Sequence, residues 1–393
     1  MRIGILTLHD SVNYGAQLQA YALRAYLTSC GHDAKVIDRR RDPGLRLKHP
    51  FCDSSRVRLL GFLDADAANG SAALERRVSR SEAFLREQVG LTSFRFCRWN
   101  EAPADLGVDV VSIGSDQVWN ANNVDVEDYL LGRIPGSPRG IAYAASVGMP
   151  DFPPETVESF RRGLTRFDAI GVREREAVTL VRSLGREAVH VVDPVLLAGR
   201  EVWTPLLAGA ASTPRKVFAY FLAEDFNRMF RPLGRYARVR GERVDFFVDW
   251  FRRPYPDGLC RWLKNRRYFH RLAQWGIDLR LDAGPVEFIR SIASADTVVT
   301  NSFHALALAV LFGKDVRVVL PTHPVRRAMN ARLTEFGQSF VRGPLICGDL
   351  DEALASLASG QRITVDGAAL QAEVAGSRTW LDAVLSKLKN KEQ

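Results

Sequence analysis

Hydrophobic and polar positions along the chain form short apolar runs, polar turns and segments with helical spacing. The first apolar run covers Arg2 to Leu8, a helical pattern follows at residues 18–26, and a second run covers residues 34–38. This order predicts a β-loop-α-β unit that opens a parallel sheet. Further apolar runs lie at residues 108–113, 140–146, 169–172 and 188–192. The first half of the chain is therefore predicted to be a doubly wound α/β domain.

A second series of strands is predicted at residues 217–222, 244–248, 277–281, 297–300 and 316–320. Residues 41–101 are charged and weakly periodic, and they predict an irregular segment and one helix. The chain divides into a Rossmann-like domain at 1–197, a Gly-, Ala- and Pro-containing linker at 198–216, a second Rossmann-like domain at 217–345, and a helical segment at 346–393. The ligand of such a pair is expected in the cleft between the domains, outside the carboxyl ends of the strands.

The composition is that of an ordinary globular protein, with 393 residues, 46% hydrophobic and 25% charged. No apolar run approaches the roughly 18 residues of a membrane span, so we expect a cytoplasmic protein. The five cysteines are scattered and never form a CxxC pair, which indicates neither a disulfide framework nor a zinc site.

Positive charge is concentrated in one segment, residues 228–271, called the basic block below. It holds thirteen Lys and Arg against four acidic residues, an excess that equals the net charge of +9. Such a block favours an anionic membrane leaflet, a phosphorylated substrate or another polyanion, and a solvated Arg-rich surface is the alternative. Nucleic acid is not predicted as a partner, because the block lacks a recognisable motif. We expect the block to lie beside the cleft.

Polar loops follow two strands of the first predicted domain. Asn13 and Gly15 precede the first helix, where backbone N–H groups can bind an anion, although a simple tight turn also fits. After the strand at 108–113, Asp116 is a candidate to accept a proton from a sugar hydroxyl, and Trp119 to stack on a sugar ring. Residues that share this loop and its predicted ligand role are Ser115 and Asn120.

Two further loops carry charged or titratable side chains. Arg173 follows the strand at 169–172, where a guanidinium could bind a carboxylate or phosphate through two hydrogen bonds, or form an ordinary Arg–Glu pair. The strand at 297–300 leads into Asn301, Ser302 and then His304 at the start of a helix. A histidine can transfer a proton near neutral pH, so His304 is a catalytic candidate.

Six segments resemble the polysaccharide pyruvyl transferase family and occur in the expected order. They are NYGAQLQAYAL (13–23), IGSDQVWN (113–120), ASVGM (145–149), GVREREA (171–177), VVDPVLL (191–197) and TNSFHALALAVLFGK (300–314). The resemblance implies two Rossmann-like domains that face a cleft, similar to the GT-B glycosyltransferase fold. It also implies transfer of the enolpyruvyl group of phosphoenolpyruvate to two sugar hydroxyls, with release of phosphate. His304 then matches the catalytic histidine, and Arg173 an arginine that binds the donor.

The chain departs from the family pattern at one position. Ketal-forming members have Arg-Leu-His where this chain has Ser302-Phe303-His304, so we expect Arg326, Arg327 or an arginine of the basic block to supply the missing charge. Expected donor contacts also include Asn301 and Ser302, and expected acceptor contacts are Asn13, Gly15, Ser115, Trp119 and Asn120. The acceptor is expected to be a cell-surface glycan or its phosphorylated or lipid-linked precursor, with peripheral membrane contact, and phosphoenolpyruvate serves as co-substrate without a metal or other cofactor. A nucleotide-sugar glycosyltransferase and a non-catalytic glycan-binding protein are the alternatives.

Overall fold

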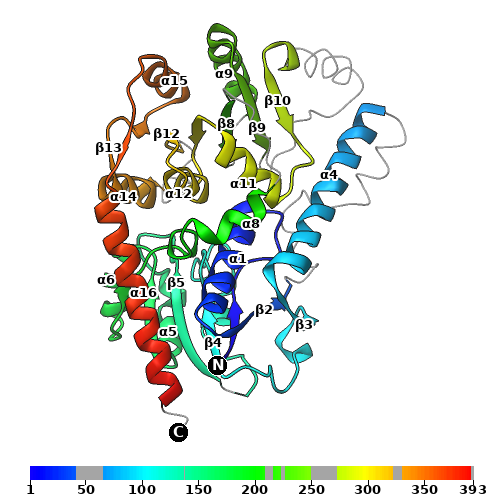
Figure 1. Ribbon diagram of the computed structural model, residues 1–393. Coiled ribbons are helices and arrows are strands. Elements are labelled where there is room, and N and C mark those ends of the chain that lie inside the picture. Colours follow the sequence, from blue (N-terminus) through cyan, green and yellow to red (C-terminus); the bar gives the residue numbers. More distant parts are fainter. Residues whose placement is uncertain are drawn as a thin grey trace.

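The protein consists of two α/β halves, one above the other along the long axis of the molecule (Figure 1). A computed structural model describes residues 1–40, 65–136, 138–208, 216–222, 226–248, 272–321 and 330–390.

The first half is built on a seven-stranded sheet with the order β3-β2-β1-β4-β5-β6-β7. Every neighbouring pair is parallel, so the carboxyl ends of all seven strands lie along one edge. The strands are β1 (Arg2–Leu6), β2 (Asp33–Arg39), β3 (Leu91–Phe96), β4 (Val110–Ile113), β5 (Arg139–Ala145), β6 (Ala169–Val172) and β7 (Val189–His190). Its helices are α1 (Tyr14–Ser29), α4 (Ala65–Phe84), α5 (Pro154–Leu164), α6 (Arg175–Ser183) and α7 (Pro194–Leu197), with short helical turns at Leu85–Val89, Trp99–Glu101 and Val126–Tyr129.

The second half is built on a six-stranded parallel sheet with the order β10-β9-β8-β11-β12-β14. Its strands are β8 (Lys216–Phe221), β9 (Arg243–Val248), β10 (Ile277–Arg280), β11 (Thr297–Thr300), β12 (Asp315–Val319) and β14 (Ile346–Cys347), and β13 (Val341–Arg342) pairs separately with β15 (Thr364–Val365). Its helices are α9 (Phe226–Arg240), α11 (Pro285–Ser294), α12 (Phe303–Leu311), α14 (Asn330–Phe340) and α15 (Leu350–Ala358). The predicted α/β fold with two Rossmann-like domains is confirmed.

The predicted domain boundaries differ from the structure in two places. The second sheet continues past residue 345, because its edge strand β14 begins at Ile346. The predicted linker contains a short helical turn at Glu201–Trp203 and helix α8 (Thr204–Leu207).

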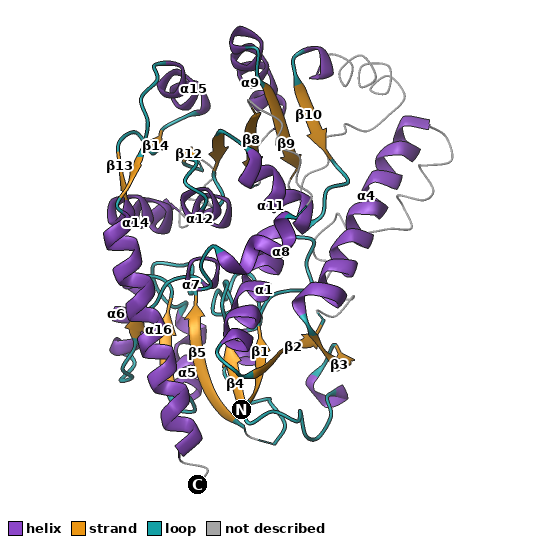
Figure 2. Ribbon diagram, viewed as in Figure 1, coloured by secondary structure: helices purple, strands orange, loops and turns teal. Residues whose placement is uncertain are grey.

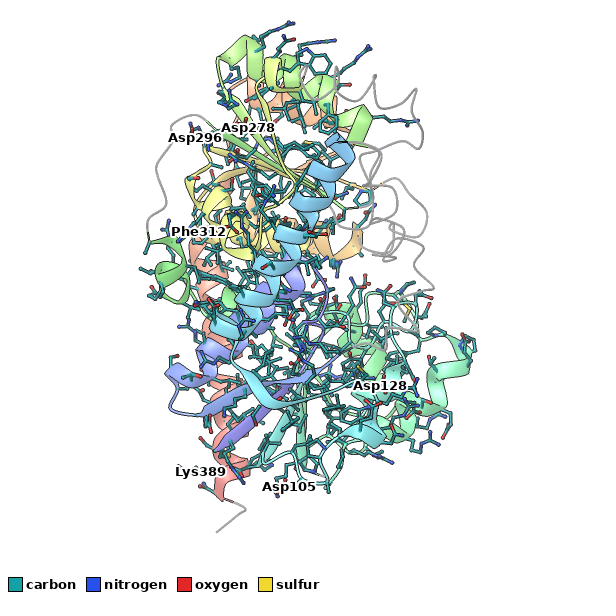
Figure 3. All side chains as sticks on the ribbon, turned by 90° about the vertical axis from the view of Figure 1, so that its right-hand side faces the viewer. Asp105, Asp128, Asp278, Asp296, Phe312 and Lys389 are labelled. Atoms are coloured by element: carbon teal, nitrogen blue, oxygen red, sulfur yellow. The ribbon has the colours of Figure 1, made fainter. Side chains whose placement is uncertain are left out.

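The last helix, α16 (Gly367–Asn390), returns from the second half and runs along the first (Figure 1). Lys389, near its end, lies at the lower end of the molecule with Asp105, whereas Asp278 and Asp296 of the second half lie at the upper end (Figure 3). Ser377 Oγ accepts a hydrogen bond from the backbone N–H of Val192, which follows β7. The predicted C-terminal helical segment therefore supports the first half as well as the second.

Helix α4 joins the two halves on the opposite side from α16 (Figure 2). Its Arg77 is buried and donates to the backbone oxygens of Val248 in the second half (2.6 Å) and Val12 in the first (3.2 Å). The Arg77 guanidinium also lies 4.4 Å from the centre of the Tyr14 ring, and the Tyr14 hydroxyl donates to the Ala283 oxygen across the boundary. One hydrophobic cluster includes residues of both halves, so they share a core.

The described part of the basic block does not all lie beside the cleft. Helix α9 ends where β9 begins, so Arg238, Arg240 and Arg243 lie at the amino edge of the second sheet, opposite the carboxyl ends of the strands. Arg240 pairs with Glu242, and Arg243 with Asp278. The prediction is therefore wrong for these three arginines, and residues 249–271 of the block lie outside the described residues. No described helix is long and apolar enough to cross a membrane.

Candidate functional site

The candidate site lies where the carboxyl ends of the first sheet meet the start of α12. Arg173 follows β6, Ser115 follows β4, and His304 is the second residue of α12 in the other half. The side chains of all three surround one residue that the sequence analysis did not single out, Asp193, which follows β7.

Asp193 is a fully buried carboxylate with partners from three directions. Its Oδ2 accepts hydrogen bonds from Arg173 Nη1 (2.9 Å) and Ser115 Oγ (3.2 Å) and lies 3.6 Å from His304 Nε2. Its Oδ1 accepts from the backbone N–H of Val195 and so caps α7. Asp193 thus links the two candidates for donor binding and proton transfer.

The charges around Asp193 explain how a buried carboxylate stays ionised. Burial alone would raise the pKa of Asp193, but His304, Arg173 and the Val195 N–H hold it well below its usual range. Burial opposes the charge of Arg173, yet the carboxylates of Glu174, Asp193 and Asp116 outweigh burial and raise its pKa. Arg173 is therefore a permanent cation in a buried site.

His304 occupies space that only a glycine in the facing helix leaves open. A Cβ atom on Gly15 of α1 would lie 2.1 Å from His304 Nδ1, well inside van der Waals contact. Gly15 therefore makes room for the imidazole, and Asn13 caps the same helix by accepting from Ala16 N–H (3.1 Å). The predicted acceptor contacts of Asn13 and Gly15 stay predictions.

The loop after β4 holds mostly buried side chains. Trp119 is fully buried, its ring packs edge-on against Phe160 and Phe167, and its indole N–H donates to the backbone oxygen of Tyr129. The prediction that Trp119 stacks on a sugar ring is therefore wrong. Ser115 is also fully buried and donates to Asp193 Oδ2, and its predicted acceptor contact stays a prediction.

Two other residues of that loop keep their predicted roles as predictions. Asn120 is mostly buried; its amide nitrogen lies 2.7 Å from one end of the Gln117 side-chain amide, and its amide oxygen accepts from Asn122 N–H within the loop. Asp116 is partly exposed and has a φ of 65°, a backbone region that few residues other than glycine adopt. Its position near Arg173 is compatible with a role at the edge of the site.

The side chains of the two polar residues before His304, Asn301 and Ser302, form hydrogen bonds with backbone groups. Asn301 is 1% exposed, and both ends of its amide bind the backbone of Leu222 beyond β8. These contacts leave no surface for a donor, so the predicted donor contact of Asn301 is wrong. Ser302 caps α12 through the Ala305 N–H, and its donor contact stays a prediction. Arg326 and Arg327 lie outside the described residues.

A pocket beside Asp193 contains a second arginine that the sequence analysis missed. Arg173, Asp193, Phe303, Arg332 and Glu335 are among its lining residues. Arg332 belongs to α14 and is 8% exposed. Among the described residues, no group of three or more histidine, cysteine or carboxylate side chains is arranged to hold a metal ion.

Different reasons explain why Asp193 and Arg332 were not found. Asp193 stands in VVDPVLL, one of the segments that carry the family resemblance, but Asp followed by Pro is also the usual start of a helix. Arg332 lies in an amphipathic helix outside every such segment, so no sequence signal distinguishes it from a surface arginine.

Two facing Rossmann-like halves, with a histidine from one half against a carboxylate and an arginine from the other, define a two-domain α/β protein of the GT-B type. The family model described as polysaccharide pyruvyl transferase matches residues 13–323, well over half of the chain. The chain therefore belongs to the polysaccharide pyruvyl transferase family and is a transferase. No curated protein matches the chain significantly.

Solved structures with the same fold are distant in sequence. The UDP-GlcNAc 2-epimerase of Methanocaldococcus jannaschii, in complex with UDP-GlcNAc and UDP, aligns with a TM-score of 0.51 and 12% identity over 91% of this chain and 92% of that chain. The UDP-N-acetylglucosamine 2-epimerase of Rickettsia bellii aligns with a TM-score of 0.50 and 9% identity over 99% of this chain and 97% of that chain. At such identities the likeness concerns the fold alone.

Proposed function

We propose that the protein transfers the enolpyruvyl group of phosphoenolpyruvate to two hydroxyls of a sugar and forms a pyruvate ketal. The observation that carries the proposal is a buried guanidinium nitrogen beside Asp193. Arg173 Nη2 has no hydrogen-bond partner among the described residues, and Arg173 lines a pocket together with Asp193, whereas His304 Nε2 faces Asp193 Oδ2 at 3.6 Å. Because buried polar atoms usually have partners in folded proteins, a ligand that completes the site is the best explanation for the unpaired nitrogen.

Donor binding follows from the fixed orientation of Arg173. Asp193 accepts from Nη1 (2.9 Å), and Glu174 Oε1 accepts from Nε at 3.4 Å, so Nη2 is left for the substrate. The Phe303 ring, 4.9 Å from the guanidinium carbon, limits its movement. A guanidinium held in this way binds a carboxylate or phosphate oxygen strongly, because the hydrogen bond is charge-assisted.

The first chemical step requires a proton donor, and His304 is the proposed one. One sugar hydroxyl attacks C2 of phosphoenolpyruvate, the double bond opens, and C3 takes a proton from His304. The hydroxyl proton goes to a base, for which Asp116 is the candidate. General acid catalysis of this kind contributes about 10² to 10⁴ in rate.

In the second step another hydroxyl of the same sugar attacks C2 and displaces phosphate, while its proton leaves with the phosphate or passes to a base. The products are the ketal and inorganic phosphate, so atoms and charge balance without a redox partner. A glycan or its phosphorylated or lipid-linked precursor is the proposed acceptor. The proposed contact with an anionic membrane involves the rest of the basic block, residues 228–235 and 249–271.

The donor is tested by comparing ligands of different chemistry. Calorimetry and thermal melting with phosphoenolpyruvate and with UDP-N-acetylglucosamine separate the proposal from a nucleotide-sugar transferase of the same fold, since a ligand of the native state raises the melting temperature. We expect stabilisation by phosphoenolpyruvate. Stabilisation by the nucleotide sugar alone would refute the proposal in favour of a nucleotide-sugar transferase. Glycan binding without turnover on any acceptor would indicate a non-catalytic glycan-binding protein.

The role of His304 is tested by His304→Ala, with His32→Gln as the control. His32 is a partly exposed histidine of the first half, remote from the site. With phosphoenolpyruvate and a panel of glycan acceptors, we expect phosphate release and ketal formation, detected by mass spectrometry, to fall by about 10² or more only for His304→Ala. Equal rates for the two variants would rule out His304 as the proton donor.

A further inference from the structure

The pocket beside Asp193 holds two arginines that come from different halves of the molecule. The guanidinium carbon of Arg173 lies 4.9 Å from the centre of the Phe303 ring, and that of Arg332 lies 5.8 Å from the same centre. Both arginines are buried. We infer that Arg332 is the second cation that binds the anionic donor, together with Arg173.

The charge of the donor requires a second cation. Phosphoenolpyruvate carries a carboxylate and a phosphate, whereas Arg173 has only Nη2 left after its contacts with Asp193 and Glu174. Ser302, at the end of the loop before α12, is uncharged and caps that helix. Arg173 and Arg332 are the only arginines or lysines among the described residues that line the pocket.

A histidine in the same pocket does not replace Arg332. Burial, and then the charge of Arg175, lower the pKa of His190, so it is not a cation at neutral pH. Glu335 faces the pocket from the same helix as Arg332; burial raises the pKa of its carboxyl, and the carboxyl pairs with Arg175 at 3.4 Å.

Arg332 also contacts the loop after β4 across the boundary between the halves. One end of the Gln117 side-chain amide lies 3.1 Å from both terminal nitrogens of Arg332, where its oxygen can accept two hydrogen bonds. Hydrogen bonds to an anionic oxygen are roughly twice as strong as those to a neutral amide. A donor phosphate or carboxylate therefore replaces Gln117 as the partner of Arg332. The donor then bridges the two halves through Arg332 and Arg173.

Arg332 lies beyond the segment that the family comparison covers, which ends at residue 323. The inference thus concerns a residue of this chain to which that comparison assigns nothing. It rests on the proposed function for the identity of the donor, but the anion-binding role itself can be measured with inorganic phosphate, the leaving group of the proposed reaction.

The test uses three variants of the full chain. Arg332→Gln removes the charge, Arg332→Lys keeps the charge without the planar fork, and Arg342→Gln is the control. Arg342 lies just after α14, and its side chain is 63% exposed, with Asp366 at 3.8 Å. Circular dichroism and thermal melting establish folding, and if Arg332→Gln does not fold, Arg332→Lys provides the test.

Calorimetric titrations with phosphoenolpyruvate and with inorganic phosphate give the result. We expect Arg332→Gln to lower the affinity for each anion by about 10- to 100-fold and Arg332→Lys to lower it less. Arg342→Gln should bind both anions with wild-type affinity. Wild-type affinity in both Arg332 variants would overturn the inference and leave the proposed function intact. If phosphate binds through Arg332 but phosphoenolpyruvate does not bind, the inference stands and the proposed donor falls. If the wild type binds neither anion, both fail.

Discussion

The close approach of α1 to the imidazole makes Gly15→Ala a sensitive probe of the site. The new Cβ would lie 2.1 Å from His304 Nδ1, and ordinary contacts begin at 3.4 Å, so the ring must move by about 1.3 Å. A displacement of about 1 Å in a catalytic group can cost 10²-fold in rate. We therefore expect kcat to fall by about 10²-fold.

The effect on stability should be much smaller than the effect on rate. Overpacking of a core costs typically about 1–3 kcal/mol, and here the imidazole can rotate away while the alanine favours the helix. We expect the affinity for phosphoenolpyruvate to change little, because Arg173 is not displaced.

Gly376→Ala is the matched control, since Gly376 also lies in a helix and its new Cβ would meet nothing within 4 Å. The assay is phosphate release from phosphoenolpyruvate in the presence of the acceptor that the glycan panel identifies, with thermal melting and calorimetry in parallel. We expect wild-type rates for Gly376→Ala. If Gly15→Ala also kept the wild-type kcat, the argument that His304 must hold its present position would be refuted.

Three further predictions concern stability and the acceptor. Asp193→Asn removes the carboxylate between Arg173 and His304 and should cost about 3–5 kcal/mol in free energy of unfolding at neutral pH, measured by denaturant titration. The pKa of Asp193 is lower in the folded than in the unfolded chain, so its contribution to the free energy of unfolding is present above about pH 4 and is lost as the pH falls further. The difference in free energy of unfolding between wild type and variant should therefore narrow at low pH. Trp119→Phe should lower the melting temperature and leave the KM for the acceptor unchanged. A raised KM would indicate that Trp119 contacts the sugar after all. Arg77→Met removes the donor of a buried carbonyl oxygen at Val248 and of a part-buried one at Val12, one in each half, and should increase cleavage in limited proteolysis. Wild-type resistance would mean that Arg77 does not hold the halves together.

Most strands of the two large sheets could be predicted because they are short apolar runs, whereas the two-residue strands β13, β14 and β15 were not predicted. β4 and β8, for example, are buried along almost their whole length, as expected for parallel strands covered on both faces. β3 was not predicted, because it is an edge strand whose residues are mostly partly exposed, so its sequence LTSFRF has no clear apolar run. The path of α16 back to the first half could not be predicted either, since its contacts, such as that of Ser377 with Val192, join residues distant in sequence.

The sequence predicted the placement of site residues well where the position of a loop was enough to place them. It did so less well where the direction of the side chain decided whether a residue faces the site. Arg173 and His304 follow strands at the expected edge, and the structure brings them to one carboxylate. Trp119 and Asn301 occupy equally favourable loop positions, but the side chain of Trp119 turns into the core and that of Asn301 towards the backbone of Leu222, just after β8. Loop position alone cannot reveal these directions, because they depend on packing against residues elsewhere in the chain.

The division of the site between the halves gives Asp193 a particular importance. His304 comes from α12 of the second half, whereas Arg173 and Asp193 come from the first, so the set exists only when the halves lie as they do here. Asp193 Oδ2 is the one atom that both side chains face, at 2.9 Å from Arg173 Nη1 and 3.6 Å from His304 Nε2. In the proposed reaction, a single carboxylate therefore orients both the proton donor and the donor-binding guanidinium, so a change at Asp193 acts on both proposed roles at once.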